Sequence, residues 1–306
     1  MIKTFTTPVV FFIYKRLQTT VKVFDVIKTI KPYNLYLIAD GPKSSNDIIQ
    51  CNTVREYIEN NIDWDCKFNK IYSTYNLGLA KRISSGLDQV FAVEESAIIL
   101  EDDTLPDQSF FWFCDELLRH YSKNERISHI SGCNPFKKVW KSDFSYDFCS
   151  IINIWGWATW KRAWMNFDLN MTKWANIDKK QFLNTWCHST SQKKGVKKMF
   201  DLHCNNPDPW TWDYQWIFSC WNSNSLGIIP RINLVSNLGI GPDATNTKSN
   251  IIEPIYPRNI ESISLPLNHP KLKRNLLLEK NYLKSTVPSL YRRIKINIKS
   301  FLKHLI

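Results

Sequence analysis

Two glycine motifs that identify common phosphate-binding α/β folds are missing from this 306-residue chain. It contains neither GxGxxG nor GxxxxGK followed by Ser or Thr, which argues against a dinucleotide-binding fold and a P-loop enzyme. Long apolar runs are also missing: the run from Val9 to Ile13 ends at Tyr14-Lys15-Arg16, far short of the roughly 18–20 residues that span a membrane. We therefore expect neither a membrane span nor a signal peptide.

The eight cysteines follow no metal-binding or disulfide pattern. No CxxC pair occurs, and no cysteine stands at ligand spacing from a histidine, which argues against a zinc site. We expect buried thiols in a reducing compartment, and therefore a cytoplasmic protein.

The net charge of +12 is concentrated at the C-terminus. Residues 271–306 hold ten Lys and Arg and one Glu, which leaves +3 for the other 270 residues. A nucleic-acid partner is not expected, because such proteins spread basic residues over a folded face. From Val287 to Leu305 apolar residues recur at helical spacing with basic residues between them. This tail is either an amphipathic helix that lies on an anionic membrane surface, making the protein peripheral on the inner face, or a helix packed on the domain.

Apolar strands and amphipathic helices alternate over the first 100 residues. Strands are predicted at 8–13, 34–39, 67–72 and 96–100, with helices at 18–30, 46–60 and 76–91 between them. This alternation predicts an α/β fold with a mostly parallel central sheet and helices on both faces. Further elements are predicted at 106–121 (helix), 127–132 (strand), 148–160 (initially strand), 173–204 (helical) and 227–235 (strand). We divide the chain into a nucleotide-binding half (about 1–132), an acceptor half (133–265) and a tail (266–306).

The strand Ser96 to Leu100 runs directly into Glu101, Asp102 and Asp103. Adjacent carboxylates repel one another unless water or a cation compensates them. Ligands of open α/β sheets bind at the carboxyl ends of the strands. The pattern therefore predicts a hard divalent cation that bridges the protein and a phosphate, although acids at a surface turn or helix start are a common alternative.

Four segments in this order resemble bacterial GT-A glycosyltransferases, which are distantly similar to N-acetylglucosaminyltransferase I. They are the acidic strand end, Trp155-Gly156-Trp157-Ala158-Thr159-Trp160, Trp212-Asp213-Tyr214-Gln215-Trp216 and Gly241-Pro242-Asp243-Ala244-Thr245. The resemblance covers about residues 5–250. It implies a GT-A-type nucleotide-diphospho-sugar transferase fold, a UDP-sugar donor, Mn²⁺ or Mg²⁺, and transfer of a hexosyl or N-acetylhexosaminyl group to a glycan or lipid-linked glycan.

The resemblance also assigns roles to the acids. Asp103 contacts the metal, Asp102 faces the ribose or the donor sugar, and Glu101 is a less certain donor contact nearer the buried strand. Asp213 is the candidate base of an inverting transfer, because one carboxylate must take the proton of the attacking hydroxyl. The alternatives are that Asp213 is a first-turn helix acid among core tryptophans, or that Asp208 is the base.

Further donor contacts are expected where strands end and a helix begins: Arg16, Asp40, Asn76, Gly78 and Arg82. Asp40 could contact uracil or form a turn, and Arg16 could contact the donor or remain at the surface. Arg82 in the first turn of a helix would be explained by a diphosphate, since a cation there opposes the helix dipole.

The tryptophan segment and the glycine-rich loop complete the predicted site. Trp155, Trp157 and Trp160 could form a platform for the sugar or the acceptor, and Gly156 would allow a ligand to approach the backbone closely. The alternative, above all for Trp160, is aromatic core beside the site. Asn246 stands where the resembling proteins often have a histidine that contacts the metal or the diphosphate. Two other functions stay open: a nucleotidyltransferase that acts on sugar phosphates, and a non-catalytic glycan-binding protein.

Overall fold

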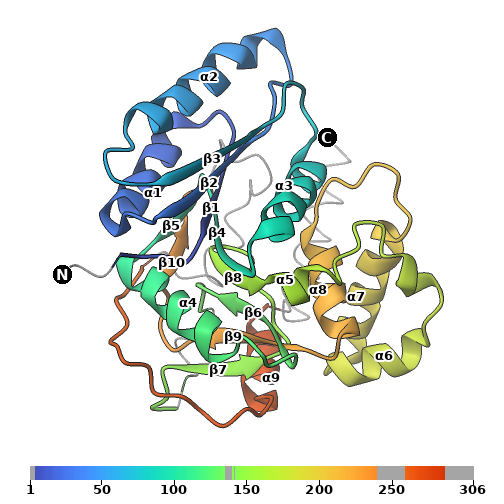
Figure 1. Ribbon diagram of the computed structural model, residues 1–306. Helices are drawn as coiled ribbons and strands as arrows, with labels where there is room; N and C mark the ends of the chain where they lie inside the picture. The colour runs from blue at the N-terminus through green and yellow to red at the C-terminus, as the bar shows by residue number, and fades with distance from the viewer. Residues whose placement is uncertain (1–3, 135–139, 141, 240–258, 287–306) are drawn as a thin grey trace, which may run out of the picture.

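The computed structural model describes residues 4–134, 140, 142–239 and 259–286 (Figure 1). Asn246, the loop Gly241 to Thr245 and the basic stretch 287–306 lie outside these ranges, so the predictions made for them stay predictions. Within the described ranges, no helix has both the length and the apolar character to cross a membrane. All eight cysteines are free thiols, and six of them are buried.

Eight strands form one sheet in the order β3-β2-β1-β4-β8-β6-β9-β7. Its first four strands are β1 (Val9–Ile13), β2 (Asn34–Ala39), β3 (Lys67–Tyr72) and β4 (Ser96–Glu101). They are connected by α1 (Leu17–Ile30), α2 (Ser45–Asn60) and α3 (Leu79–Val93). Neighbouring strands in this half run parallel, as the alternating pattern predicts. All five residues of β1 are buried, because helices cover both faces of a parallel sheet.

The direction of the crossovers reverses between β1 and β4. The chain moves from β1 to β2 and β3 toward one edge, and then returns through α3 to place β4 on the other side of β1. Helix α1 packs against α2, whereas α3 packs against α5 (Lys161–Trp164) on the other side of the sheet (Figure 1). Such a reversal leaves a crevice at the carboxyl ends of the two strands. The residues that follow β1 and β4 therefore face the same crevice.

The second half of the sheet is mixed. Its strands are β6 (Ile127–Ser131), β7 (Tyr146–Cys149), β8 (Trp157–Trp160) and β9 (Leu226–Pro230). Strand β8 runs antiparallel to both β4 and β6, and β9 runs parallel to β6. A separate antiparallel pair joins β5 (Thr104–Pro106) to β10 (Val235–Asn237). The predicted α/β class with a mostly parallel central sheet and helices on both faces is confirmed.

Two predicted strands are each divided in the structure. The segment 148–160 supplies the end of β7 and all of β8, separated by an irregular stretch that includes Gly156 at φ +62°. The segment 227–235 supplies β9, a turn and the start of β10. Both divisions leave irregular backbone near the crevice.

The remaining helices of the described residues follow β5 in the chain. They are α4 (Gln108–His120), the 3₁₀ turn η1 (Thr172–Ala175), α6 (Lys179–Trp186), α7 (Thr190–His203), α8 (Asp213–Asn222) and α9 (Leu276–Thr286). The predicted helical region 173–204 is thus three elements. Asp178 and Ser189 divide it, because their side chains accept hydrogen bonds from Gln181 N and Gln192 N and so begin new helices.

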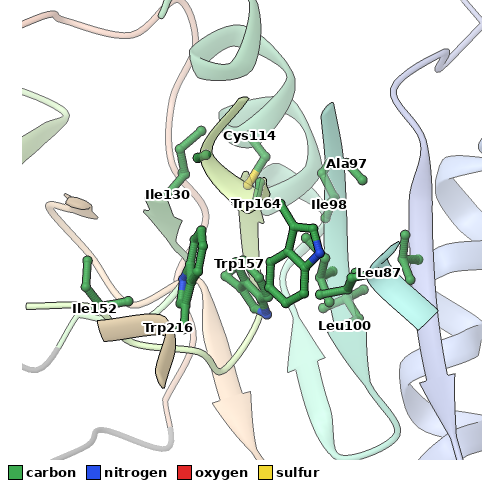
Figure 2. Close-up of a cluster of buried hydrophobic side chains, with 14 of the residues drawn as sticks. Leu87, Ala97, Ile98, Leu100, Cys114, Ile130, Ile152, Trp157, Trp164 and Trp216 are labelled. Atoms are coloured by element: carbon green, nitrogen blue, oxygen red, sulfur yellow. The ribbon is translucent and has the colours of Figure 1, made fainter. Parts of the chain in front are cut away.

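An aromatic core lies between the two halves of the sheet. The rings of Trp157, Trp164 and Trp216 lie within 6.4 Å of one another, centroid to centroid, among aliphatic side chains from β4 and α3 (Figure 2). His129 stacks on Trp157 at 5.3 Å and accepts a hydrogen bond from Trp216 Nε1. This cluster joins α8, which begins at Asp213, to the centre of the sheet.

The C-terminal segment packs on the body through a buried carboxylate. Glu279 on α9 is 1% exposed; it accepts hydrogen bonds from Ser150 N at 2.6 Å and Arg274 Nε at 2.9 Å, and pairs with His188 at 2.5 Å. Burial disfavours its charged form, but these partners outweigh burial and lower the pKa of Glu279. The carboxylate therefore stabilises the fold while it is ionised.

We expect Glu279→Gln to destabilise the protein by about 3–5 kcal/mol at pH 7, because removing one member of a buried ion pair leaves Arg274 without a charged partner. The lowered pKa means that this contribution is present above the ordinary carboxyl pKa of 4.5 and is lost as the pH falls through the lower folded-state value. Denaturant unfolding at pH 7 and pH 4 should show a smaller difference between the two proteins at pH 4. Glu95→Gln, at a side chain that is 87% exposed, is the matched control.

Candidate functional site

A cleft of about 970 Å³ opens at the crevice between β1 and β4. One arm is lined by the ends of β1, β2 and β4 and by the start of α3. The other arm is lined by residues 150–155 and by side chains of α7, α8 and α9. Of the sequence-predicted residues within the described ranges, the cleft brings together ten: Arg16, Asp40, Asn76, Gly78, Arg82, Glu101, Asp102, Asp103, Trp155 and Asp213.

Arg16 forms ion pairs with two of the predicted acids. Its Nη2 donates hydrogen bonds to Oδ1 of Asp102 and, at 2.7 Å, to Oδ2 of Asp103. Asp102 is 5% exposed, and its second oxygen, Oδ2, has no hydrogen-bond partner among the described residues. The acidic strand end is therefore partly, but not completely, compensated by protein groups.

Burial disfavours the charged forms of Glu101 and Asp102. Burial, and after it the charges of Asp103 and Asp102, raise the pKa of Glu101 to about 8. Burial also raises the pKa of Asp102, to about 6, although the charge of Arg16 opposes this shift. The neutral form is thus favoured more strongly in Glu101 than in Asp102, whose charge is compensated by Arg16.

The oxygen set at the acidic strand end fits a hard divalent cation. No third acid, histidine or cysteine within the described part of the chain completes a three-ligand group with these two aspartates. Mg²⁺ and similar ions commonly use only one or two carboxylates and take their other ligands from water and substrate phosphates. The unpartnered Oδ2 of Asp102 is a suitable ligand atom, and a Cβ at Gly239 would lie 2.1 Å from Asp103 Oδ2, so only glycine lets the backbone approach this carboxylate.

Arg82 supplies a cation without a hydrogen-bond partner among the described residues in the same arm of the cleft. The residue is 6% exposed, and its Nε and Nη2 make no hydrogen bond to the described residues. Burial lowers the pKa of Arg82, and the charge of Asp40 opposes that shift. A buried guanidinium without partners is costly, and an anion bound in the cleft would satisfy it.

The start of α3 offers further donors to an anion. Gly78 occupies the N-cap position at φ +77°, and no side chain caps the helix there. Helix N-termini with free N–H groups attract phosphates. Arg82 lies in the first turn of this helix and lines the cleft, and its contact with a diphosphate stays a prediction.

The side chains of Asp40 and Asn76 form hydrogen bonds with backbone groups at the edge of the cleft. Asp40 accepts hydrogen bonds from Gly41 N and Leu77 N, both at 2.9 Å, and from Gly78 N at 3.0 Å. Asn76 Nδ2 donates to Gly41 O at 2.9 Å. The turn interpretation of Asp40 is thus present in the structure, and its carboxylate joins the end of β2 to the start of α3. The predicted contacts of both side chains with a donor stay predictions.

Asp213 lies across the cleft from the acidic strand end. It is the first residue of α8 and accepts a hydrogen bond from Thr211 Oγ1. Asp213 and Glu101 both line the cleft. The rival base Asp208 is 97% exposed, lies 4.0 Å from Lys81, and does not line the cleft.

The structure corrects the predicted tryptophan platform. Trp155 lines the cleft, but Trp157 is fully buried within β8 and stacks on His129 and Trp212. Strand β8 lies between β4 and β6 with helices on both faces, so both of its faces are core. Trp160 is also buried, as the core interpretation predicts.

Gly156 likewise serves packing instead of contacting the cleft. A Cβ at this position would lie 2.7 Å from Cγ2 of Val235 on β10. The glycine therefore allows the segment before β8 to approach β10 of the small sheet. Neither Gly156 nor Trp157 is positioned to contact a donor.

Several residues that line the cleft were not predicted as site residues from the sequence. Tyr14 and Lys15 follow β1 directly and could have been found by the strand-end argument used for Arg16. Residues of the second arm carry no such signal, because the arm assembles from distant segments. They include Ile152, His188, Val196, Phe200, Trp210, Ile217, Trp221 and Glu279.

Comparison with known proteins identifies no family for this chain. No family model and no curated protein matches it. Among solved structures, it is similar to the mannosyltransferase PcManGT from Pyrobaculum calidifontis in complex with GDP-Man and Mn²⁺, with 16% identity and a TM-score of 0.36 over 52% of this chain and 46% of that one. The matched region thus spans less than half of the mannosyltransferase.

Two other solved structures match at a comparable level. They are a UDP-glucose pyrophosphorylase complexed with UDP-glucose (10% identity, TM-score 0.31, 53% of this chain and 79% of that one) and the 4-diphosphocytidyl-2C-methyl-D-erythritol synthase of Anaerococcus prevotii (10%, 0.33, 64% and 84%). Similarity this low does not identify an activity. The function is therefore inferred from the cleft itself.

Proposed function

We propose that this chain is a glycosyltransferase that moves a sugar from a nucleotide-diphosphate sugar, with UDP as the nucleotide, to an acceptor hydroxyl. One observation carries the proposal: a buried, unpartnered cation and a pair of charged carboxylates line the arm at the β1–β4 crevice, and a further carboxylate lies opposite them. Arg82 suits the diphosphate, Asp102 and Asp103 suit a divalent cation, and Asp213 suits a base.

In the proposed reaction, one set of residues stabilises the leaving diphosphate and Asp213 activates the acceptor hydroxyl. Transfer breaks the bond between the sugar and the diphosphate, so negative charge develops on the leaving phosphate. Arg82 and the free N–H groups of α3 stabilise that charge from one side. Mn²⁺ or Mg²⁺, held by Asp103 and Asp102, would supply Lewis-acid stabilisation when bound. Asp213 takes the proton of the acceptor hydroxyl as it attacks the face of the sugar opposite the diphosphate, which inverts the configuration.

The second arm is proposed to hold the acceptor. Apart from Glu279, its lining comes from the acceptor half, about residues 133–265, whereas the donor arm comes from residues 1–132 apart from Asn237 and Gly239. Its lining is largely apolar and aromatic, with Trp155 and Trp210 near Asp213 in the cleft. Such side chains stack on sugar rings and also suit the apolar part of a lipid-linked glycan. We propose a glycan or lipid-linked glycan acceptor, and a cytoplasmic enzyme peripheral to the membrane through residues 287–306.

A nucleotide screen tests the reaction class. The full chain is heated with UDP, GDP, CDP or ADP, with and without Mn²⁺, and then incubated with the matching nucleotide sugars. A glycosyltransferase should be stabilised by one nucleoside diphosphate and should release that diphosphate. Formation of pyrophosphate from a nucleoside triphosphate and a sugar phosphate would support a nucleotidyltransferase instead. Stabilisation by glycans but by no nucleotide would leave only a glycan-binding protein.

Arg82→Met should weaken binding of the nucleoside diphosphate by about 10- to 100-fold, since a charge-assisted hydrogen bond contributes roughly 1.5–3 kcal/mol. The unliganded variant should be at least as stable as the parent, because the buried guanidinium makes no hydrogen bond to the described residues. Isothermal titration and denaturant unfolding measure the two effects. Lys81→Met removes the same charge from a side chain that is 48% exposed, and it should leave binding unchanged. Equal affinities of Arg82→Met and the parent would contradict this role.

A further inference from the structure

Arg16 stands between the two carboxylates that fit a metal ion. A single nitrogen, Nη2, bonds both Asp102 Oδ1 and Asp103 Oδ2. A cation held by these same oxygens would sit about 2.0–2.1 Å from each of them, in the space that this nitrogen fills. The guanidinium and the cation therefore exclude each other at this pair of oxygens.

The position of Arg16 in the fold makes its bond to the acids replaceable. Arg16 is the N-cap residue of α1, and no side chain caps that helix. A positive charge at a helix N-terminus is unfavourable, so the two acids hold it there against the helix dipole. Its side chain is 32% exposed, which leaves room for it to turn within the cleft.

Arg16 also leaves one oxygen of the two carboxylates without a hydrogen-bond partner among the described residues. Asp102 is buried, yet its Oδ2 makes no hydrogen bond to the described residues while Arg16 holds Oδ1. A divalent cation with its waters can satisfy more carboxylate oxygens than one guanidinium nitrogen can. The acids therefore gain partners when the cation replaces Arg16, and Arg16 loses its own.

We propose that Arg16 is a built-in counter-ion that the divalent cation displaces, and that the released guanidinium then binds the donor diphosphate. This inference rests on the proposed function, because it takes a diphosphate as the ligand of the cleft. It makes cation and nucleotide binding mutually dependent. Without a nucleotide, the cation must leave Arg16 unpaired; with one, Arg16 gains a new anionic partner, so each ligand strengthens the binding of the other.

The test measures Mn²⁺ binding, independently of activity. Free Mn²⁺ is followed by its electron paramagnetic resonance signal during titration of the full chain, with and without UDP. UDP should tighten Mn²⁺ binding to the parent by about 5- to 150-fold, the usual range for coupled sites. Arg16→Gln should bind Mn²⁺ about 10-fold or more tightly than the parent when UDP is absent, and UDP should tighten its binding less.

Controls separate displacement from general electrostatics and from misfolding. Lys81→Gln removes one positive charge from the first turn of α3 without touching the acids, and it should titrate like the parent. Arg16→Lys keeps the charge and should give an Mn²⁺ affinity between those of the parent and Arg16→Gln. Thermal unfolding of each variant shows that it is folded at the temperature of the titration.

Three outcomes overturn the inference. They are an unchanged or weaker Mn²⁺ affinity of Arg16→Gln without UDP, an equal gain in Lys81→Gln, and no Mn²⁺ binding by any variant. The proposed function is judged separately, by whether a nucleoside diphosphate stabilises the parent protein. If UDP binds while Arg16→Gln and the parent titrate alike, the displacement is wrong and the nucleotide site stands. If no nucleotide binds, the proposed function itself fails.

Discussion

Replacing Asp213 by Asn should reduce kcat by about 10²- to 10⁴-fold, the usual contribution of a general base. Asparagine keeps the size and the polar oxygen of the side chain, so it can still accept the hydrogen bond of Thr211. It cannot take a proton from the acceptor hydroxyl. The loss should therefore appear in turnover measured at saturating donor and acceptor.

Binding measurements distinguish this loss from damage to the site. Because Asp213 lies across the cleft from Arg82 and the acidic strand end, the affinity of Asp213→Asn for the nucleoside diphosphate should equal that of the parent. Asp208→Asn is the control, since this acid is 97% exposed and does not line the cleft. Near-normal transfer by Asp213→Asn, or a loss in Asp208→Asn instead, would show that the base is assigned to the wrong residue.

Asp103→Asn should abolish the stimulation of turnover by Mn²⁺. The carboxylate is 17% exposed and points to the crevice, where it is one of the two charged acids of the site. An amide oxygen is a much weaker ligand of a hard cation than a carboxylate oxygen. Turnover of the variant in Mn²⁺ should therefore fall to the level that the parent shows in EDTA.

A titration of turnover against Mn²⁺ concentration measures this effect. Asp103→Asn should show no rise at concentrations that saturate the parent, and Asp208→Asn should follow the parent curve. A variant that reaches the parental rate at the same Mn²⁺ concentration would exclude Asp103 as a metal ligand. Parental turnover that is equal in Mn²⁺ and EDTA would show a reaction that needs no metal.

The donor side of the cleft was predictable because the end of a strand can be recognised from a few neighbouring residues in the sequence. Apolar runs that stop at polar residues located β1, β2 and β4, and parallel order brings their carboxyl ends to one edge. Arg16, Asp40 and Asp103 were found in this way. The sequence could not show that Arg16 bonds Asp102 and Asp103, since that contact depends on side-chain directions from two separate strands.

Tryptophan was harder to interpret because its sequence context is the same in a core and in a binding site. Trp155 and Trp157 are two residues apart, yet one lines the cleft and the other is buried. What separates them is the pairing of β8 with β4 and β6, which buries Trp157. Likewise, the helical pattern of 173–204 concealed two new helix starts, although Asp178 and Ser189 are ordinary capping residues.

The buried carboxylate of Glu279 sets an order of events during synthesis of the protein. It lines the second arm of the cleft and bonds Ser150 and His188, which precede it by 129 and 91 residues. The donor arm is built only from residues 12–103, apart from Gly239 and its neighbours, and its parallel strands can pair while the chain is still being made. The wall of the second arm is complete only after α9 has left the ribosome. A nascent chain can thus pair the four parallel strands beside one arm of the cleft long before the wall of the other arm is complete.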